Sequence, residues 1–232
     1  MTGLATRATD AAIARIARLD PRLAAFSTVV PEHAREQARH LDACVALGAP
    51  PEPLYGHAVA VKDIIDVAGL PTGGGSLTRD GVAAAAADAR VVRRLRAAGA
   101  VLIGKTRTVE YAFGGWGTNV TVGTPRNPWD MTDTRAPGGS SSGSGVAVAA
   151  GLAPMALGTD TGGSVRLPAA FCGIVGLKTT FGLLPLDGVL PLGEAFDSIG
   201  PMTNTVADAA RLFAAMLAED ATKLPGARPM RA

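Results

Sequence analysis

Apolar residues recur at three- to four-residue spacing in several parts of the chain, which is the period of one buried face of an α-helix. Ile13, Ile16 and Leu19 follow this spacing in residues 9–19, and the Asp-Pro pair that comes next is expected to end the helix. A second helix is predicted for residues 31–48, because this segment opens on a proline and closes on a glycine. Further helices are predicted for residues 88–98, 106–113, 146–150 and 167–171, and a last one opens at residue 205.

Short apolar runs of strand length separate these helices. They predict strands at residues 57–61, 100–103, 155–158, 174–177 and 197–199. The succession of strand, helix and strand between residues 57 and 103 favours an α/β fold with parallel strands. The chain has 232 residues, enough for one sizeable core, so we expect one domain over residues 1–221 and a disordered tail over residues 222–232.

The composition excludes several classes of protein. Hydrophobic residues make up 47% and charged residues 18%, as in soluble globular proteins, and the net charge of +2 argues against a nucleic-acid partner or an anionic membrane. No apolar run approaches the roughly 20 residues that span a bilayer. The N-terminus lacks the apolar core of a signal peptide, so a cytoplasmic location is the expectation. Cys44 and Cys172 could pair, but their spacing indicates neither a disulfide framework nor a zinc site.

Two clusters of glycine and serine carry the candidate chemistry. They occupy residues 138–143 (GGSSSG) and 162–164 (GGS), with the apolar run AVAAGLAPMALG between them. Glycines allow successive backbone N–H groups to converge on one point, where they can stabilise an oxyanion, and a serine in such a nest can be the attacking group. Flexible linkers have a similar composition, but the intervening run is apolar enough to require burial.

Lys62 is the candidate base. It ends the predicted strand 57–61, and the apolar residues Ile64, Ile65 and Val67 follow it, so its amine cannot easily reach bulk water. Burial favours the neutral form of a lysine, whose ordinary pKa is about 10.4. The alternative is a lysine that faces solvent at the end of its strand.

Two other motifs match known patterns without the context that those patterns need. Residues 99–106, GAVLIGKT, fit the phosphate-binding pattern GxxxxGK(S/T), but we predict a strand there, whose N–H groups are used in the sheet. Residues 139–143 fit the nucleophile elbow GxSxG, which needs a histidine after the serine. His33, His40 and His57 all precede it, so only a triad in another chain order stays open. SxxK and HExxH motifs are absent.

The sequences GGSSSG, GTDTGGSVRLPAAFCGIVGLK and AVAVKDIIDVAGLPT resemble the landmarks of the amidase signature family, and the similarity extends from about Thr9 to Asp220. The resemblance implies amide hydrolysis by a Ser–Ser–Lys triad. In it Ser164 attacks the carbonyl, Ser140 relays the proton from a cis peptide position, and neutral Lys62 is the base. The implied oxyanion hole consists of the backbone N–H groups of Thr161, Gly162, Gly163 and Ser164.

The resemblance also implies the surroundings of this triad. Ser141 is expected to support the hydrogen bonds, and Asp160 to anchor the second turn. Arg166 would either bind a substrate carboxylate or form a structural ion pair, which we favour. Trp116 and Trp129 are pocket wall or simple loop packing. The implied fold is a layered α/β structure with a central mixed, largely parallel sheet covered by helices. The implied ligand is a small amide, with no metal or cofactor.

This chain departs from the family in two respects. Ser142 stands where many members have glycine, which would matter if that position required a positive φ. Members are also about twice as long, so the sheet is expected to be incomplete at its C-terminal side. The chain is therefore either an amidohydrolase by itself or a weakly active or inactive relative that needs a partner chain, of the kind found in amidotransferases, or self-association to supply the missing half.

Overall fold

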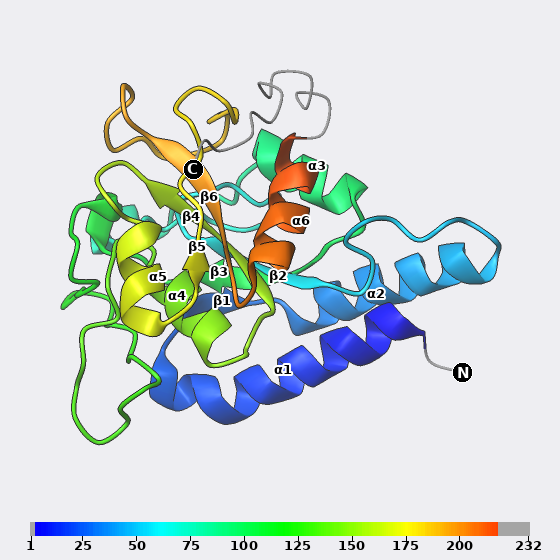
Figure 1. Cartoon of the computed structure of the whole chain (residues 1–232), viewed down its shortest axis with the longest axis horizontal. Coiled ribbons are helices and arrows are strands. Elements are labelled where there is room, and N and C mark those ends of the chain that lie inside the picture. The colour runs from blue at the N-terminus through cyan, green and yellow to red at the C-terminus, as the bar shows by residue number, and fades with distance from the viewer. Residues whose placement is uncertain (1–2, 218–232) are drawn as a thin grey trace, which may run out of the picture.

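A computed structural model describes residues 3–217 and shows a six-stranded sheet with helices on both faces (Figure 1). The strand order is β1-β3-β2-β4-β6-β5. The strands are β1 Phe26–Val29, β2 Ala58–Lys62, β3 Val101–Thr106, β4 Met155–Asp160, β5 Val175–Gly176 and β6 Ser198–Thr203. Strand β2 pairs in parallel with β3 and with β4, and the other three pairings are antiparallel. The predicted mixed sheet is confirmed, but it is not largely parallel, because the parallel pairs are confined to its centre.

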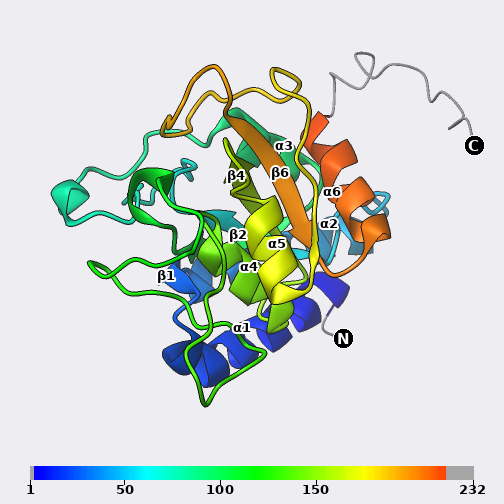
Figure 2. The same cartoon turned by 60° about the vertical axis from the view of Figure 1, so that its left-hand side comes forward.

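The helices form pairs on the two faces of this sheet, as Figures 1 and 2 show. Helix α1 packs against α2 below the sheet, α4 packs against α5, and α3 packs against α6. Their bounds are α1 Leu4–Leu23, α2 Pro31–Ala46, α3 Arg90–Ala97, α4 Ser142–Ala149, α5 Arg166–Cys172 and α6 Val206–Leu217. Two short 3-10 turns, Leu77–Arg79 and Glu110–Ala112, lie in the connections.

Two hydrophobic cores result, one on each face of the sheet. Alternate residues of β2 enter opposite cores: Ala58 and Ala60 join the residues of α1, α2 and α4, whereas Val59 and Val61 join those of α3 and α6. Such alternation follows from the two-residue period of a strand. Because both faces are covered, β2, β3 and β4 are buried along their whole lengths. The end of β2, where Lys62 lies, is therefore inside the protein.

The first helix is longer than predicted. It begins at Leu4 and passes through Pro21 to Leu23, where Ala24 ends it in the left-handed conformation with φ of 51°. The side chain of Asp20 accepts a hydrogen bond from the backbone N–H of Ala25 at 2.7 Å, so the residues after the helix have a hydrogen-bond partner within its last turn. The expectation that the Asp-Pro pair stops the helix was wrong by one turn.

The helix predicted for residues 106–113 does not form. Strand β3 continues to Thr106, because it is paired with β2 on one side and β1 on the other. Only the 3-10 turn follows, in which Tyr111 and Ala112 adopt left-handed angles with φ of 47° and 61°. The N–H of Tyr111 is donated to the carbonyl of Gly74 at 2.8 Å, so this segment bonds to a distant loop. Strand β1 was not predicted from the sequence.

The segment GAVLIGKT, which matches the phosphate-binding pattern, is confirmed as a strand. Strand β3 occupies most of it and hydrogen-bonds to β1 on one side and β2 on the other. The last strand, β6, is longer than the predicted 197–199 and pairs with all of β4. Val206, although apolar, is 72% exposed at the start of α6. Cys44 and Cys172 are both free, so they do not pair.

None of the helices between residues 3 and 217 is both long enough and apolar enough to cross a membrane. The predicted tail, residues 222–232, lies outside the described residues.

Candidate active site

Lys62 is the centre of a buried polar cluster at the end of β2. Its side chain is fully buried, and its Nζ donates to Ser140 Oγ at 2.7 Å and to Thr159 Oγ1 at 2.8 Å. Ser140 precedes α4, and Thr159 lies on β4, the strand beside β2. Both partners are neutral hydroxyl groups, so no carboxylate hydrogen-bonds this amine within residues 3–217. The lysine therefore does not face solvent, and its environment suits a neutral amine.

The electrostatics agree with this geometry. Burial lowers the pKa of Lys62 to about 7, against the opposing effect of the negative charges of Asp160 and Asp197. A lysine that loses its proton near neutral pH can act as a general base at working pH, because the best catalytic base titrates close to that pH.

Ser140 is held from several sides. The peptide bond between Gly139 and Ser140 is cis. The carbonyl of Ser140 accepts hydrogen bonds from the hydroxyl of Thr108 at 3.0 Å and from the N–H of Val109 at 3.2 Å. The residue before it, Gly139, donates its N–H to the carbonyl of Gly115 at 2.8 Å. The Ser140 side chain is thereby directed at Lys62 by its backbone.

Ser164 lies next to this pair. Its carbonyl accepts the N–H of Ser141 at 3.2 Å, which links the two serine clusters directly. Ser164 is 8% exposed, whereas Lys62 and Ser140 are fully buried, so the opening of the site lies on the Ser164 side. The Ser164 hydroxyl makes no hydrogen bond to Ser140. The structure thus joins Lys62 directly to Ser140, and joins Ser164 to them through the backbone.

Asp160 organises the turn that carries Ser164. Its carboxylate accepts the N–H of Gly163 at 2.7 Å and that of Val165 at 3.1 Å. Arg166 makes two further contacts with it, Nε at 3.0 Å and Nη2 at 2.9 Å. Burial would raise the pKa of Asp160, but Arg166 and the backbone N–H groups outweigh it and hold that pKa below its usual value. Arg166 and Asp160 thus form a bidentate ion pair within the protein, which is the alternative that we favoured over binding of a substrate carboxylate.

The turn that carries Ser164 is exposed to solvent at Gly162. A Cβ built on Gly162 would meet nothing within 4 Å. The N–H of Gly163 is committed to Asp160, whereas those of Thr161, Gly162 and Ser164 donate to no residue between 3 and 217. Three of the four N–H groups that we expected in an oxyanion hole therefore have no hydrogen-bond partner in the described chain.

The remaining serines of the first cluster differ in their contacts. The hydroxyl of Ser141 lies between the backbone N–H and carbonyl of Thr159, at 3.2 and 3.3 Å, so it fastens the start of α4 to β4. Ser142, which replaces the glycine of many relatives, is the first residue of α4 and has no positive φ. Its buried hydroxyl has no hydrogen-bond partner in the described chain.

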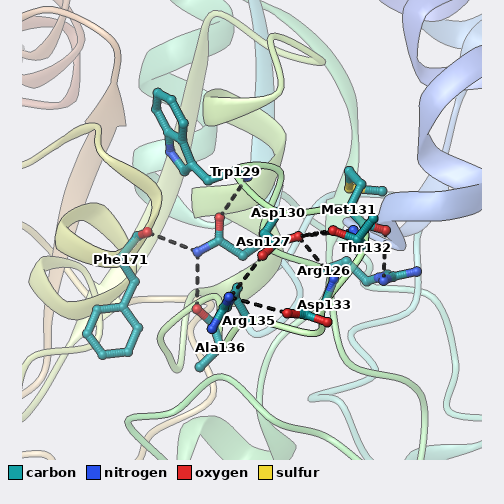
Figure 3. A network of polar contacts seen from close by, with 10 residues as sticks. All are labelled: Arg126, Asn127, Trp129, Asp130, Met131, Thr132, Asp133, Arg135, Ala136 and Phe171. Carbon is teal, nitrogen blue, oxygen red and sulfur yellow. Dashed lines mark hydrogen bonds and ion pairs between the residues drawn. The ribbon is translucent and has the colours of Figure 1, made fainter.

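The side chain of Asn127 connects two parts of the segment that leads into Ser140 and joins it to α5, as Figure 3 shows. Asn127 donates to the carbonyls of Ala136 at 3.1 Å and Phe171 at 2.9 Å. Trp129, although 74% exposed, donates its indole N–H to the carbonyl of Cys172 at 2.7 Å. This anchors the loop on α5. Trp116 is also exposed, and its ring lies 6.2 Å from that of Phe171.

The sequence reasoning missed two side chains of this region. Thr159, the second partner of Lys62, lies in the quoted GTDTGGS motif, one residue before Asp160, but gives no chemical signal of its own. Lys105 is as fully buried as Lys62, and its Nζ contacts Asp63 at 2.9 Å and Thr72 at 3.1 Å. Its apolar neighbours in GAVLIGKT were a signal for burial that we applied only to Lys62. His33 and His40 lie on α2 and His57 lies before β2, and none of the three hydrogen-bonds to a serine of the described chain.

Comparison with known proteins agrees with the motifs. A sequence model of the family described as Amidase matches residues 7–231. A glutamyl-tRNA(Gln) amidotransferase chain, the A subunit, of Symbiobacterium thermophilum is 49% identical over 212 residues, which cover 91% of this chain and 43% of that protein. The 2-amino-5-chloromuconic acid deaminase of Comamonas testosteroni is 47% identical, over 93% of this chain and 46% of the deaminase.

A solved structure has a similar fold. The native peptide amidase from Stenotrophomonas maltophilia superimposes with a TM-score of 0.85 at 40% identity, over 97% of this chain and 48% of the amidase. The chain thus spans less than half the length of the relatives that it matches.

Proposed function

The chain belongs to the amidase family, and we propose that it hydrolyses the C–N bond of a small carboxamide through an acyl-enzyme on Ser164. The observation that carries this proposal is the 2.7 Å contact between the buried Lys62 amine and Ser140 Oγ, beside the Ser164 turn. A buried, neutral lysine next to a serine relay is an activating base of the kind that serine nucleophiles need.

The proton path follows from this order of residues. Ser164 Oγ attacks the amide carbon and passes its proton to Ser140. In this step the Ser140 hydroxyl donates across the 2.7 Å contact, and its own proton moves to the lone pair of the neutral Lys62 Nζ. The C–O bond forms as the carbonyl electron pair moves onto oxygen. When the tetrahedral intermediate collapses, the C–N bond breaks, and Lys62 returns the proton through Ser140 to the leaving nitrogen. Water then attacks the ester carbon and gives one proton through Ser140 to Lys62. As the C–O bond to Ser164 breaks, that proton returns through Ser140 to Ser164 Oγ, and the acid is released.

The oxyanion would be stabilised by backbone N–H groups at the turn. Those of Thr161, Gly162 and Ser164 support this role, because they are not used elsewhere in the described chain. Gly163 supports the turn instead, since Asp160 takes its N–H. Removing one donor from an oxyanion hole typically costs about 10²–10³ in turnover.

An alkyl fluorophosphonate tests the proposed nucleophile directly. The serine oxygen displaces fluoride, and the adduct stays on that residue. We expect mass spectrometry to find the adduct on Ser164 and to find none in Ser164→Ala. Ser142→Ala is the matched control, because it removes a nearby serine that has no assigned role. Labelling that persists in Ser164→Ala would show that another residue is the nucleophile. Release of ammonia from a panel of small amides then measures hydrolysis.

A second candidate is a chain that acts only with a partner. It is favoured by the similarity to a subunit of an amidotransferase, and by exposed aromatics beside the site. Phe113 is 81%, Trp116 69% and Phe196 66% exposed. Exposed apolar surface of this kind favours association.

Size-exclusion chromatography and amide hydrolysis, each without and with the remaining part of the Symbiobacterium thermophilum relative as a separate chain, test this second candidate. We expect the chain to self-associate alone, with low activity that rises when that part is added. A stable monomer with full turnover would contradict the need for a partner.

A further inference from the structure

Asp197 is a buried carboxylate that the proposed mechanism does not use. It precedes β6 and is 6% exposed. Its oxygens accept the backbone N–H groups of Leu192 at 2.9 Å and Gly193 at 3.1 Å, and the hydroxyl of Thr161. All of these donors are neutral. Burial of a carboxylate without a cation is costly, so such a residue calls for a reason.

The other buried carboxylates near the site do have cations. Asp63 contacts Lys105 at 2.9 Å, and Asp160 contacts Arg166 at 2.9 Å. Among residues 3–217, Asp197 forms no ion pair. Of these three buried carboxylates, Asp197 alone lacks a cation among the described residues.

The fold places this charge close to the Lys62 cluster. Strand β6 pairs with β4 so that Asp160 lies opposite Ser198, and the next residues outward are Thr161 and Asp197. Asp197, Thr161, Thr159 and Ile64 line one narrow hollow, and Thr159 is itself a hydrogen-bond partner of Lys62. The residues that follow Lys62 pack on the loop that ends at Asp197, since Leu190 donates its N–H to the carbonyl of Ile64 at 2.8 Å.

We propose that Asp197 is a positioning residue of the amide-cleaving site, which fixes the oxyanion turn through the Thr161 hydroxyl and stabilises Lys62 once that lysine carries a proton. The inference rests on the proposed function. Attack by Ser164 puts a positive charge on a buried amine, and a fixed, uncompensated carboxylate nearby lowers the free energy of that charged state.

The other charged groups around Lys62 are already balanced. Strand β3 contributes Lys105, which is paired with Asp63, and β4 contributes Asp160, which is paired with Arg166 of α5. Helix α4 carries no charged residue. Asp197 therefore supplies a charge that a substitution can remove without breaking an ion pair of the described chain.

Titration of Lys62 in the full chain provides the test, and it does not require activity. The chain has only four lysines, so ¹³C-labelled lysine resonances can be assigned with single variants. In Asp197→Asn we expect the midpoint of Lys62 to fall by about one pH unit, because the protonated form loses a stabilising charge. Glu194→Gln removes an exposed charge from the same loop and should leave the midpoint unchanged.

The pH dependence of fluorophosphonate labelling gives the second readout. Asp197→Asn should move the acid limb of the labelling rate to lower pH by the same amount and lower the plateau. Thr161→Val keeps the carboxylate but removes its hydroxyl partner, so it should lower the plateau several-fold with the midpoint unmoved. Thr161→Ser, which keeps a hydroxyl, should restore the plateau.

Two results would overturn the two roles that we propose for Asp197. An unchanged Lys62 midpoint in Asp197→Asn overturns the electrostatic role, and a Thr161→Val plateau equal to that of the native chain overturns the positioning role. If Asp197→Asn does not fold, Asp197→Ser replaces it, and failure of both to fold would make Asp197 purely structural and the proposal wrong. If Ser164 is never labelled, the proposed function fails, yet the titration still reports on Asp197.

Discussion

Lys62 and Lys105 lie on neighbouring strands, both fully buried, yet their surroundings differ in one respect. Lys62 pairs in register with Thr106, and Lys105 pairs with Val61, so the two side chains point to opposite faces of the sheet. Lys62 meets two hydroxyl groups, whereas Lys105 meets the carboxylate of Asp63 at 2.9 Å. Burial lowers the pKa of both amines, and for Lys105 the adjacent Asp63 opposes it.

The difference teaches that burial alone does not make a lysine a base. A carboxylate in direct contact keeps the ammonium form and yields a structural ion pair. A carboxylate at a distance, as Asp160 and Asp197 are for Lys62, raises the pKa only enough to leave it near neutral. Lys105 also fastens Asp63, the residue after Lys62, so the structural lysine helps to hold the strand end on which the proposed base lies.

The largest effect should separate the two lysines by reactivity. Lys62→Met removes the proposed base, so we expect labelling of Ser164 by a fluorophosphonate to slow by roughly 10³-fold. Lys105→Met should stay within about tenfold of the native rate per folded molecule, because its amine is not in the proton path. Measured rates at pH 8 are compared after the folded fraction has been determined by circular dichroism. Equal losses in the two variants would contradict the distinction.

Stability should separate them in the opposite direction. Lys105→Met leaves Asp63 buried without its cation, which should lower the free energy of unfolding by about 3–5 kcal/mol. The double variant with Asp63→Asn should recover part of this loss, since the uncompensated charge is then gone. Lys62→Met should be at least as stable as the native chain at pH 7. Urea unfolding at that pH measures all three, and a Lys105→Met chain of native stability would refute the structural role.

The third effect is the slope of stability with pH, which is small for each single pH unit. Lys62 has a folded pKa of about 7 and an unfolded value near 10.5, so between these values the unfolded chain binds more protons. Stability should therefore rise with pH across this window, by at most about 1.4 kcal/mol per pH unit for one group, and the cost of burial should be complete below pH 7. Lys62→Met should lose this contribution. Urea midpoints from pH 7 to 10 measure it, and an unchanged slope in the variant would place the Lys62 pKa elsewhere.

Much of the fold could be predicted because it depends on local pattern. The stripes of Ile13 and Ile16 in α1 and of Val91 and Leu95 in α3 are buried as their spacing indicates. The strand at GAVLIGKT was predicted because its apolar residues exclude a loop. The helix at residues 106–113 was predicted wrongly, because pairing of Thr106 with β1 and β2 outweighs helix propensity.

The sequence by itself determined which groups are available for chemistry and roughly where each stands: a lysine at a strand end, and serines at glycine-rich turns. It could not determine the charge state of that lysine, because that depends on contacts between segments far apart in the chain. Only the tertiary structure decided that Asp63 lies against Lys105 rather than Lys62, and that Thr159 and Ser140 are the partners of the Lys62 amine. Electrostatic energies vary steeply with distance and burial, and neither quantity is written in the order of the residues.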